Sequence, residues 1–354
     1  MLVLIAVLAA RWYVATARVK EVAAASALAA SKAGTTRQTD SVRRRASPAG
    51  AGEAFHLAAM HQPAIEQYRA RSAADMKALP ASTKALDTAQ VEQLKTLADA
   101  GNARAACVLA MQISKCAFFP VVRRKEVRER EASLARLRAE SGDVTAAEAR
   151  LAGSRAMLQA LDASCEGFSV GSEHKAWMYL LQSALMGFEP AMMQFSSFPL
   201  FDPEDVNASI DGFSAYMYYA GPLTEALAQR GDLNAVTQAS WDYSNTGPTF
   251  LDMIGLNALP RDPARALMYA HVRQEIMLRR EAITRGSTGA WGRPEAAVER
   301  YQNGVGDEGR AWARQMADQM LATFDASVFA PPATKPERDA PNNLMDDIDS
   351  ICRE

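Results

Sequence analysis

A glycine flanked by alanines recurs along this chain at nearly constant intervals, and this feature restricts the possible folds more than any other. Aligned on the glycine, four segments read LADAGNARAA, LRAESGDVTAA, SALMGFEPAM and LAQRGDLNAV. The glycines are Gly101, Gly142, Gly187 and Gly231, so successive copies lie 41, 45 and 44 residues apart. Self-similarity at an interval of roughly 40 residues indicates an architecture built from repeated structural units.

The residue types around each glycine are those of a helix-turn-helix corner. Glycine lacks a Cβ atom and therefore ends a helix in the left-handed conformation at little cost. In three copies the next residue is Asn102, Asp143 or Asp232, whose side-chain oxygen can cap the following helix. In the third copy, Pro190 suits a first helical turn. Alanines, which let two antiparallel helices approach closely, lie three residues before each glycine (Ala98, Ala139, Ala184, Ala228) and four after it (Ala105, Ala146, Ala191, Ala235).

The composition favours the same class of fold. Of the 354 residues, 49% are hydrophobic and only 7% are aromatic, so the core consists mainly of alanine, leucine and methionine. Alanine has the highest helix propensity, whereas period-two runs of β-branched and aromatic residues are almost absent. We therefore predict an all-α fold in which helix-turn-helix repeats stack into an α-solenoid over residues 54–329.

One copy resembles a known repeat. KAWMYLLQSALMGFEPAMMQFSS contains Lys175-Ala176, Tyr179, Ala184 and Gly187 in an order similar to that of the Sel-one-like family of tetratricopeptide-like repeats. RDPARALMYA and RYQNGVGDEGRAW are also similar to parts of such a unit, and the resemblance covers about residues 90–325. The resemblance implies an α-solenoid scaffold that holds partners on a curved surface, frequently in bacterial envelopes and signalling complexes.

The N-terminal segment, residues 1–17, has features of a targeting signal. It opens with an apolar run from Leu2 to Ala10 and ends in Ala15-Thr16-Ala17, which suit the core and the cleavage site of a secretory signal. We predict a protein that is exported or anchored in the membrane, on the periplasmic side; the alternative is a cytoplasmic protein that buries this helix. Residues 18–53 are small, polar and basic, and we predict a linker or an exposed helix there.

The charge distribution limits the partners. The net charge of -2 and the pI near 6.2 exclude a global basic field of the kind that binds nucleic acid without sequence preference. The basic cluster Arg43-Arg44-Arg45 suits a soluble linker or contact with anionic lipid headgroups. Residues 330–354 are predicted to form a disordered acidic tail, with a small docking helix near the end as the alternative.

The four cysteines allow a bonded and a reduced interpretation. Cys107 and Cys116 fall on one predicted helix, about 13 Å apart along its axis, which is too far for a disulfide. Cys116 and Cys165 each lie near a predicted helix end, so we expect this pair to form a disulfide in an oxidising compartment. The alternative is that these residues and Cys352 are ordinary reduced thiols, with Cys107 in the core.

Three motifs associated with catalysis or binding occur in contexts that do not suit them. GFSVG, residues 167–171, matches the nucleophile elbow around Ser169 but follows a helical segment and not a strand. GVGDEG, residues 304–309, matches a dinucleotide-binding pattern but also follows a helix and carries two acids. The histidines lack metal-ligand spacing: His56, His61, His174 and His271. We therefore predict no catalytic residue, no cofactor and no metal site.

Aromatic residues at three places are the candidates for a partner surface. They lie in AWMY, in AYMYYA, which also contains Tyr218, and in SWDY; the selected residues are Trp177, Tyr179, Tyr216, Tyr219, Trp241 and Tyr243. We predict a non-enzymatic repeat scaffold that binds a protein or peptide partner, with no nucleic acid and with a membrane tether through the N-terminus as a further possibility. The alternative is an envelope hydrolase whose helical repeats flank its active site.

Overall fold

The chain divides into two compact units, Met1–Gly50 and Ala51–Glu354, and the description concerns the second. The computed structural model describes residues 59–80, 86–140, 143–170, 175–197, 200, 210–244, 259, 261–284, 295–330 and 351–352. These residues form helices and contain no strand, which confirms the predicted all-α class. The N-terminal segment 1–17, the segment 18–53 and Gly142 lie outside the described residues.

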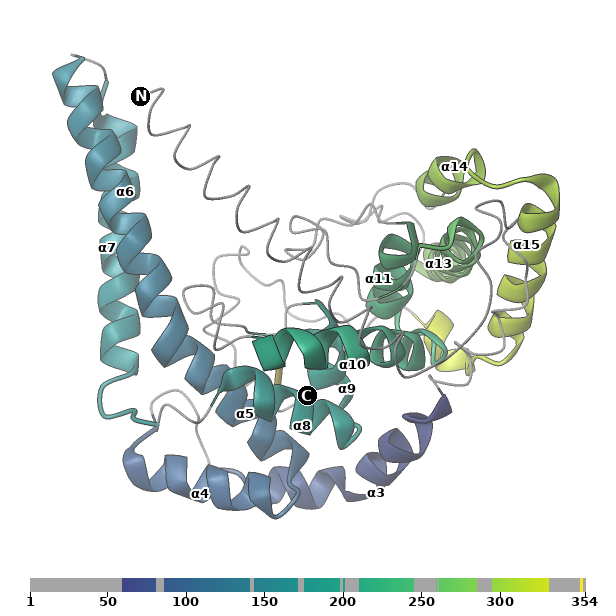
Figure 1. Cartoon of the computed structure of the whole chain (residues 1–354), viewed down its shortest axis with the longest axis horizontal. Helices are drawn as coiled ribbons and strands as arrows, with labels where there is room; N and C mark the ends of the chain where they lie inside the picture. Colours follow the sequence, from purple (N-terminus) through teal and green to yellow (C-terminus); the bar gives the residue numbers. More distant parts are fainter. Residues whose placement is uncertain are drawn as a thin grey trace, which may run out of the picture. The chain divides into compact units, whose positions relative to one another are not determined.

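The described helices are shown in chain order in Figure 1. They are α3 (Gln62–Ala78), α4 (Thr88–Asp99), α5 (Ala103–Ile113), the π-helical turn η2 (Ser114–Phe118), α6 (Phe119–Ala139), α7 (Thr145–Ser164), α8 (Ala176–Leu185), α9 (Glu189–Ser197), α10 (Ile210–Ala228), α11 (Leu233–Ser244), α13 (Pro263–Thr284), α14 (Ala296–Gln302), α15 (Asp307–Ala322) and the 3-10 helix η3 (Ala326–Phe329).

Most of these helices pack on their neighbours in chain order. Helix α5 packs on α4 and α8, α9 packs on α8 and α10, α11 packs on α10 and α13, and α15 packs on α13. We call these helices the main body. Their side chains form one continuous core, in which every residue of α5 is buried.

Three of the four predicted glycine corners join helices of the main body. Gly101, Gly187 and Gly231 have φ of +89°, +90° and +81°. Each glycine N–H donates to the carbonyl three residues earlier, and the next N–H donates to the carbonyl five residues earlier. This pair of hydrogen bonds is the Schellman arrangement, which satisfies carbonyls at the end of a helix. The glycines therefore turn α4 into α5, α8 into α9 and α10 into α11.

The caps and the alanines at these corners also match the prediction. Asn102 Oδ1 accepts from Ala105 N at 2.9 Å, and Asp232 Oδ1 accepts from Ala235 N at 2.8 Å. The six alanines that flank the three corners are at most 1% exposed: Ala98, Ala105, Ala184, Ala191, Ala228 and Ala235. A larger side chain at these positions would separate the two helices of the corner.

The second copy departs from the prediction, since Ala139 and Ala146 are exposed. They lie on the pair α6 and α7, which we call the arm. The extensive contacts of its two helices, among the described elements, are with each other and with η2. The arm has a small core of its own, made of Val127, Leu134 and Leu151. The second copy is therefore not a buried corner of the main body, because the surfaces of the arm helices are too polar to be covered.

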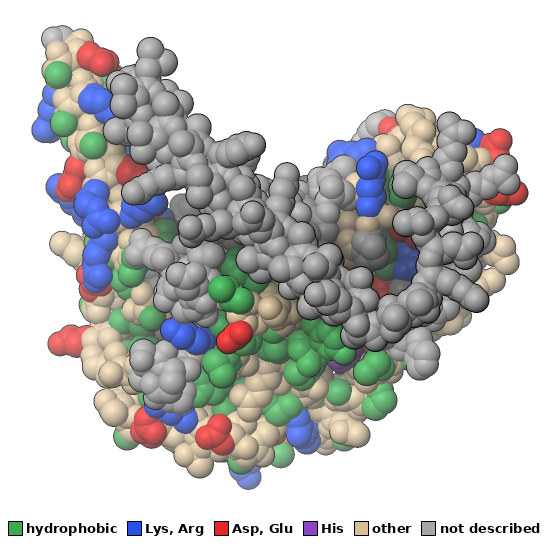
Figure 2. Space-filling model, viewed as in Figure 1, with side chains coloured by type: hydrophobic (Ala, Val, Ile, Leu, Met, Phe, Trp, Pro, Cys, Tyr) green, Lys and Arg blue, Asp and Glu red, His purple; other side chains and the backbone are tan. Residues whose placement is uncertain are grey.

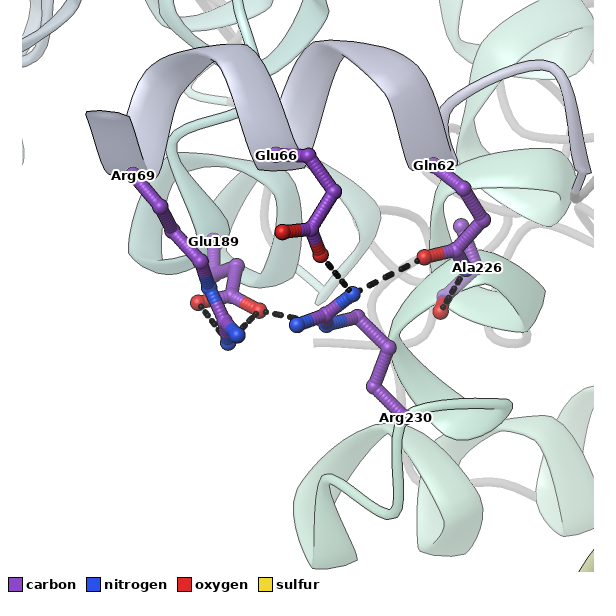
Figure 3. Close-up of polar contacts among 6 residues, drawn as sticks. All are labelled: Gln62, Glu66, Arg69, Glu189, Ala226 and Arg230. Carbon is purple, nitrogen blue, oxygen red and sulfur yellow. Dashed lines mark hydrogen bonds and ion pairs between the residues drawn. The ribbon is translucent and has the colours of Figure 1, made fainter. Parts of the chain in front are cut away.

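Helix α3 crosses the corners of the main body (Figure 3). Near its beginning, Glu66 contacts Arg230 at 2.7 Å, and further along Arg69 contacts Glu189 at 2.9 Å. Near its end, Asp75 Oδ2 accepts from Ala103 N at 3.2 Å, beside the Gly101 corner. A Cβ atom on Gly187 would lie 2.2 Å from the carbonyl oxygen of Ala64 in α3. This corner therefore requires glycine for the approach of α3 as well as for its φ angle.

The continuous helical stretch Ala103–Ala139 is long and apolar enough to cross a membrane by length and composition. Its most apolar window has a mean hydropathy of 1.7 and is 71% buried. The burial arises because α5, at the beginning of the stretch, lies in the core of the main body. The core helix of a globular protein satisfies the same criteria.

Candidate functional site

The structure does not place the six selected aromatic residues on a common surface. Tyr179, Tyr216 and Tyr243 are 8%, 1% and 0% exposed, so the prediction that they face a partner is wrong. The hydroxyl group of Tyr216, for example, donates to the carbonyl of Ser196 at 2.9 Å inside the core. These rings face neighbouring helices because consecutive helices of the main body cover them on both sides.

The other three selected residues have an intermediate exposure to solvent. Trp177 and Tyr219 are partly buried and pack against the core, and Trp241 is also partly buried. The rings of Trp177 and Tyr219 therefore contribute to the core of the main body.

An exposed apolar face lies instead on the first half of α10. Tyr218, Ile210 and Met217 are 71%, 52% and 43% exposed, and Ser214 between them is also exposed. Positions 210, 214, 217 and 218 recur at helical spacing and therefore share one side of α10. We call Ile210, Met217 and Tyr218 the α10 face.

The surface around this region differs from that of the arm. Figure 2 shows Lys, Arg, Asp and Glu side chains along the arm and a larger share of hydrophobic side chains over the region of α8 to α10. Among the described large hydrophobic residues, Tyr218 is the most exposed, and its ring lies edge-on to that of Tyr219 with centroids 4.8 Å apart. Exposed aromatic residues held by a neighbouring ring are suited to anchor a protein contact.

Sequence reasoning named Tyr218 within AYMYYA but selected Tyr216 and Tyr219 from that run. The signal for the exposed side of α10 was the spacing of Ile210, Ser214, Met217 and Tyr218. Because residues i, i+4, i+7 and i+8 lie on one side of a helix, Tyr218 belongs to a different side from Tyr216. Which side is covered depends on the neighbouring helices, and the spacing alone does not identify them.

A second group of residues is buried between α10, α11 and α13. Tyr243 donates its hydroxyl proton to Glu225 Oε1, and Arg265 Nη1 donates to the Tyr243 oxygen at 2.9 Å. Arg265 also lies 3.9 Å from Glu225 and 3.4 Å from Asp262. The Tyr269 ring stacks on Tyr243 with centroids 5.9 Å apart. These contacts connect three consecutive helices of the main body.

Burial determines the protonation behaviour of this group. It raises the pKa of Glu225 above its ordinary value, although the hydrogen bond from Tyr243 and the charge of Arg265 act in the opposite direction. Burial, together with the charge of Glu225, also raises the pKa of Tyr243 and of Tyr269. Buried ionisable groups with shifted pKa values occur in active sites and also in structural ion-pair networks. Since these residues lie within the core, the arrangement suits a structural connection between helices.

The catalytic and phosphate-binding motifs adopt the contexts that the sequence indicates. Ser169 is exposed in the segment that follows α7, and Gly167 before it has φ of +80°. In GVGDEG, Gly304 and Gly306 lie between α14 and α15, and Gly309 lies in the first turn of α15. Within the described ranges, no group of three His, Cys, Asp or Glu residues is arranged to hold a metal ion. His61 and His271 have pKa values lowered by burial, while His56 and His174 lie outside these ranges.

Two disulfides join the four cysteines. Cys116 and Cys165 have sulfur atoms 2.11 Å apart, in the pairing expected from the bonded interpretation. They connect η2 to the residue that ends α7 and so close the base of the arm. Cys107 in α5 pairs with Cys352, with sulfur atoms 2.10 Å apart.

The second disulfide joins one residue of the predicted C-terminal tail to helix α5. Cys352 is 0% exposed, and its carbonyl accepts from Arg104 Nη1 at 3.1 Å. The guanidinium group of Arg104 is itself buried against the ring of Phe188, 5.1 Å from its centroid. Ile351 and Cys352, within the predicted tail of residues 330–354, are therefore held at the core, while residues 331–350 and 353–354 lie outside the described residues.

Comparison of the chain with models of protein families, with curated proteins and with solved structures finds no match.

Proposed function

We propose that the protein is a non-enzymatic α-solenoid scaffold, of the kind that Sel-one-like repeats form, and that it binds a protein partner through the α10 face. The observation that carries this proposal is the exposure of Tyr218, Ile210 and Met217 on one side of α10. An aromatic residue and flexible apolar side chains on a rigid helix are typical anchors of protein contacts.

The helical corners support the scaffold part of the proposal. The same Schellman turn, capped or followed by a proline, occurs between α4 and α5, α8 and α9, and α10 and α11. A unit that recurs in this way cannot bury its apolar face alone and must stack on a neighbour. Stacked helix pairs present their outer sides on a common surface, which is the arrangement that a binding scaffold requires.

We further propose that the protein acts outside the cytoplasm, exported or anchored on the periplasmic side of a bacterial envelope. Two disulfide pairs support this, because disulfides persist in oxidising compartments. Thiols should be counted in fractionated native cells by a maleimide-polymer gel shift. Four protected cysteines in the envelope fraction are expected, whereas four free thiols in the soluble fraction would support the cytoplasmic alternative.

The partner surface can be tested by site-specific photocrosslinking in native cells. A photoreactive residue in place of Met217 is expected to give a discrete crosslinked species, and adding Tyr218→Asp is expected to abolish it. The matched control is the photoreactive residue at Met157, an exposed methionine on the arm. The same species from Met157, or a Met217 crosslink unchanged by Tyr218→Asp, would contradict the proposed surface.

A further inference from the structure

We propose that the disulfide Cys116–Cys165 is a redox-sensitive latch, which a dithiol reductant opens while Cys107–Cys352 stays closed, and that its opening frees the base of the arm. Cys116 lies in η2 and Cys165 ends α7, so the bond joins the two ends of the arm at its base. The inference does not depend on the function proposed for the α10 face.

The two disulfides differ in their access to solvent. Cys107 and Cys352 are both 0% exposed. Cys116 and Cys165 are partly exposed, and the residue that follows each of them is exposed. The contact between Ser164 Oγ and Cys165 Sγ, at 3.8 Å, is likewise only partly buried. Thiol–disulfide exchange requires a thiolate to reach a sulfur atom, so the reaction is expected to be faster at the partly exposed bond.

The reaction transfers two electrons from the dithiol to the disulfide. A thiolate of the reductant attacks Cys165 Sγ and forms a mixed disulfide, and the sulfur of Cys116 leaves as a thiolate that takes up a proton. The second thiolate of the reductant then attacks the reductant's own sulfur in the mixed disulfide and expels the Cys165 thiolate, which also takes up a proton. Both protons come from the thiols of the reductant, so the products are two protein thiols and one reductant disulfide.

Apart from this bond, the two helices of the arm are held together by weak contacts. Ion pairs between them recur every seven residues along both helices: Arg124–Asp162, Glu131–Arg155 and Arg138–Glu148. Each of these side chains is between 43% and 60% exposed, and exposed ion pairs contribute little to stability. The apolar contribution comes from the small core of Val127, Leu134 and Leu151. The covalent bond is therefore the strongest connection between the two helices at the base.

The structure of the base gives the arm a point at which it can bend. The turn η2 is π-helical and interrupts the helical stretch Ala103–Ala139, and long helices bend at such turns. After Cys165, Phe168 and Val170 pack against the core of the main body. Both ends of the arm therefore stay attached to the main body after reduction, and the change is confined to η2 and the arm.

The test uses the purified full chain in its oxidised form, with dithiothreitol as the reductant under native conditions. Thiols are trapped with a maleimide at successive times, and the labelled cysteines are identified by peptide mass spectrometry. Cys116 and Cys165 are expected to react together, at least about tenfold faster than Cys107 and Cys352, because a reductant reaches a buried disulfide only after local unfolding.

Amide hydrogen exchange of the half-reduced protein measures the release of the arm. Exchange in η2 and in the last turn of α7 is expected to become at least about tenfold faster, whereas exchange in α11 stays unchanged. Cys116→Ser with Cys165→Ser is expected to show the fast exchange without reductant and no further response to it. Cys107→Ser with Cys352→Ser, the matched control, is expected to keep the response of the arm. Should this control fail to fold, the buried disulfide of the wild type serves as the internal control.

Four results would each overturn the inference. They are four free thiols before any reductant is added, four thiols that appear together, earlier reaction of the buried pair, and unchanged exchange in η2 and α7 of the half-reduced protein. Tyr218→Asp is expected to leave all of these measurements unchanged. The latch and the α10 face can therefore fail independently of each other.

Discussion

Helix pairs α8–α9 and α6–α7 are both joined at a copy of the glycine and alanine pattern, but the main body covers the first and leaves the second exposed. In α8–α9 the flanking Ala184 and Ala191 are 1% and 0% exposed. In the arm, the equivalent Ala139 and Ala146 are exposed. The difference shows that the pattern specifies a corner between two helices and does not specify that other helices cover it.

The surfaces of the helices explain this difference. Helix α6 begins with FPVVRRKEVRERE, and its charged residues form ion pairs within the arm, such as Arg130 with Glu126 at 2.6 Å and Arg155 with Glu131 at 2.6 Å. Covering these side chains would require their desolvation, which ion pairs repay poorly. Helix α5, in contrast, has the sequence ARAACVLAMQI and is buried along its whole length. Stacking therefore depends on whether a helix is apolar on more than one side.

The largest effect is expected from the disulfides, which differ between the two regions. Cys107–Cys352 spans 245 residues and ends in the core, whereas Cys116–Cys165 spans 49 residues at the base of the arm. From loop-closure entropy, Cys107→Ala with Cys352→Ala is expected to lower the free energy of unfolding by about 5 kcal/mol. Cys116→Ala with Cys165→Ala is expected to lower it by about 4 kcal/mol. The free energy of unfolding in urea measures both. A larger decrease in unfolding free energy on removal of Cys116–Cys165 than on removal of Cys107–Cys352 would contradict this prediction.

The next effect concerns glycine in the two regions. Gly187→Ala is expected to cost about 3 kcal/mol, because the new Cβ would meet the α3 backbone and the residue has positive φ. Gly153→Ala, on α7, has open space at the Cβ position and is expected to stabilise the arm by about 0.5 to 1 kcal/mol through helix propensity. Urea unfolding of both variants checks the opposite signs. Equal losses would show that the corner has no special requirement for glycine.

Enlarging the alanines tests whether the corners differ in packing. Ala191→Leu inserts a large side chain into a fully buried position and is expected to cost about 2 kcal/mol. Ala146→Leu, at the equivalent exposed position of the arm, is expected to change stability by less than about 0.5 kcal/mol. Thermal unfolding followed by circular dichroism distinguishes them. A comparable loss at Ala146 would mean that the arm is covered after all.

The smallest effect is a dependence on pH, of opposite sign in the two regions. In the main body, burial raises the pKa of Glu225, so the folded state holds its proton more tightly than the unfolded state. This carboxyl stabilises the fold below its ordinary pKa of about 4.5, and that contribution is lost as the pH rises through the raised value.

In the arm, the pKa of Glu126 is lowered, since hydrogen bonds from Arg123 and Arg130 outweigh the effect of burial. Its contribution is present above pH 4.5 and is lost as the pH falls through the lowered value. Glu225→Gln is expected to abolish the decrease in stability that occurs as the pH rises, and Glu126→Gln the decrease that occurs as the pH falls. Each change in the free energy of unfolding is expected to be less than about 1 kcal/mol. Amide hydrogen exchange in α11 and in α7 as a function of pH reports the two regions separately. If the stability of both helices changed in the same direction with pH, the environments assigned to Glu225 and Glu126 would be wrong.

The helix corners of this protein follow from its sequence, because the interactions that form them are local. Gly101 and Gly231 turn the chain through hydrogen bonds to residues three and five positions earlier, and Asn102 and Asp232 cap the next helix within three residues. Such contacts depend on neighbouring residues alone. The pairing of Cys116 with Cys165 was also accessible, since both lie at helix ends that the local pattern predicts.

Tertiary structure alone decided which surfaces are covered. Tyr216 and Tyr218 are two residues apart in the same run, yet one is 1% exposed and the other 71%. Cys352 pairs with Cys107 across 245 residues. Helical periodicity divides side chains into faces, but burial depends on contacts between segments far apart in the chain, and no local pattern encodes which helix will lie against which face.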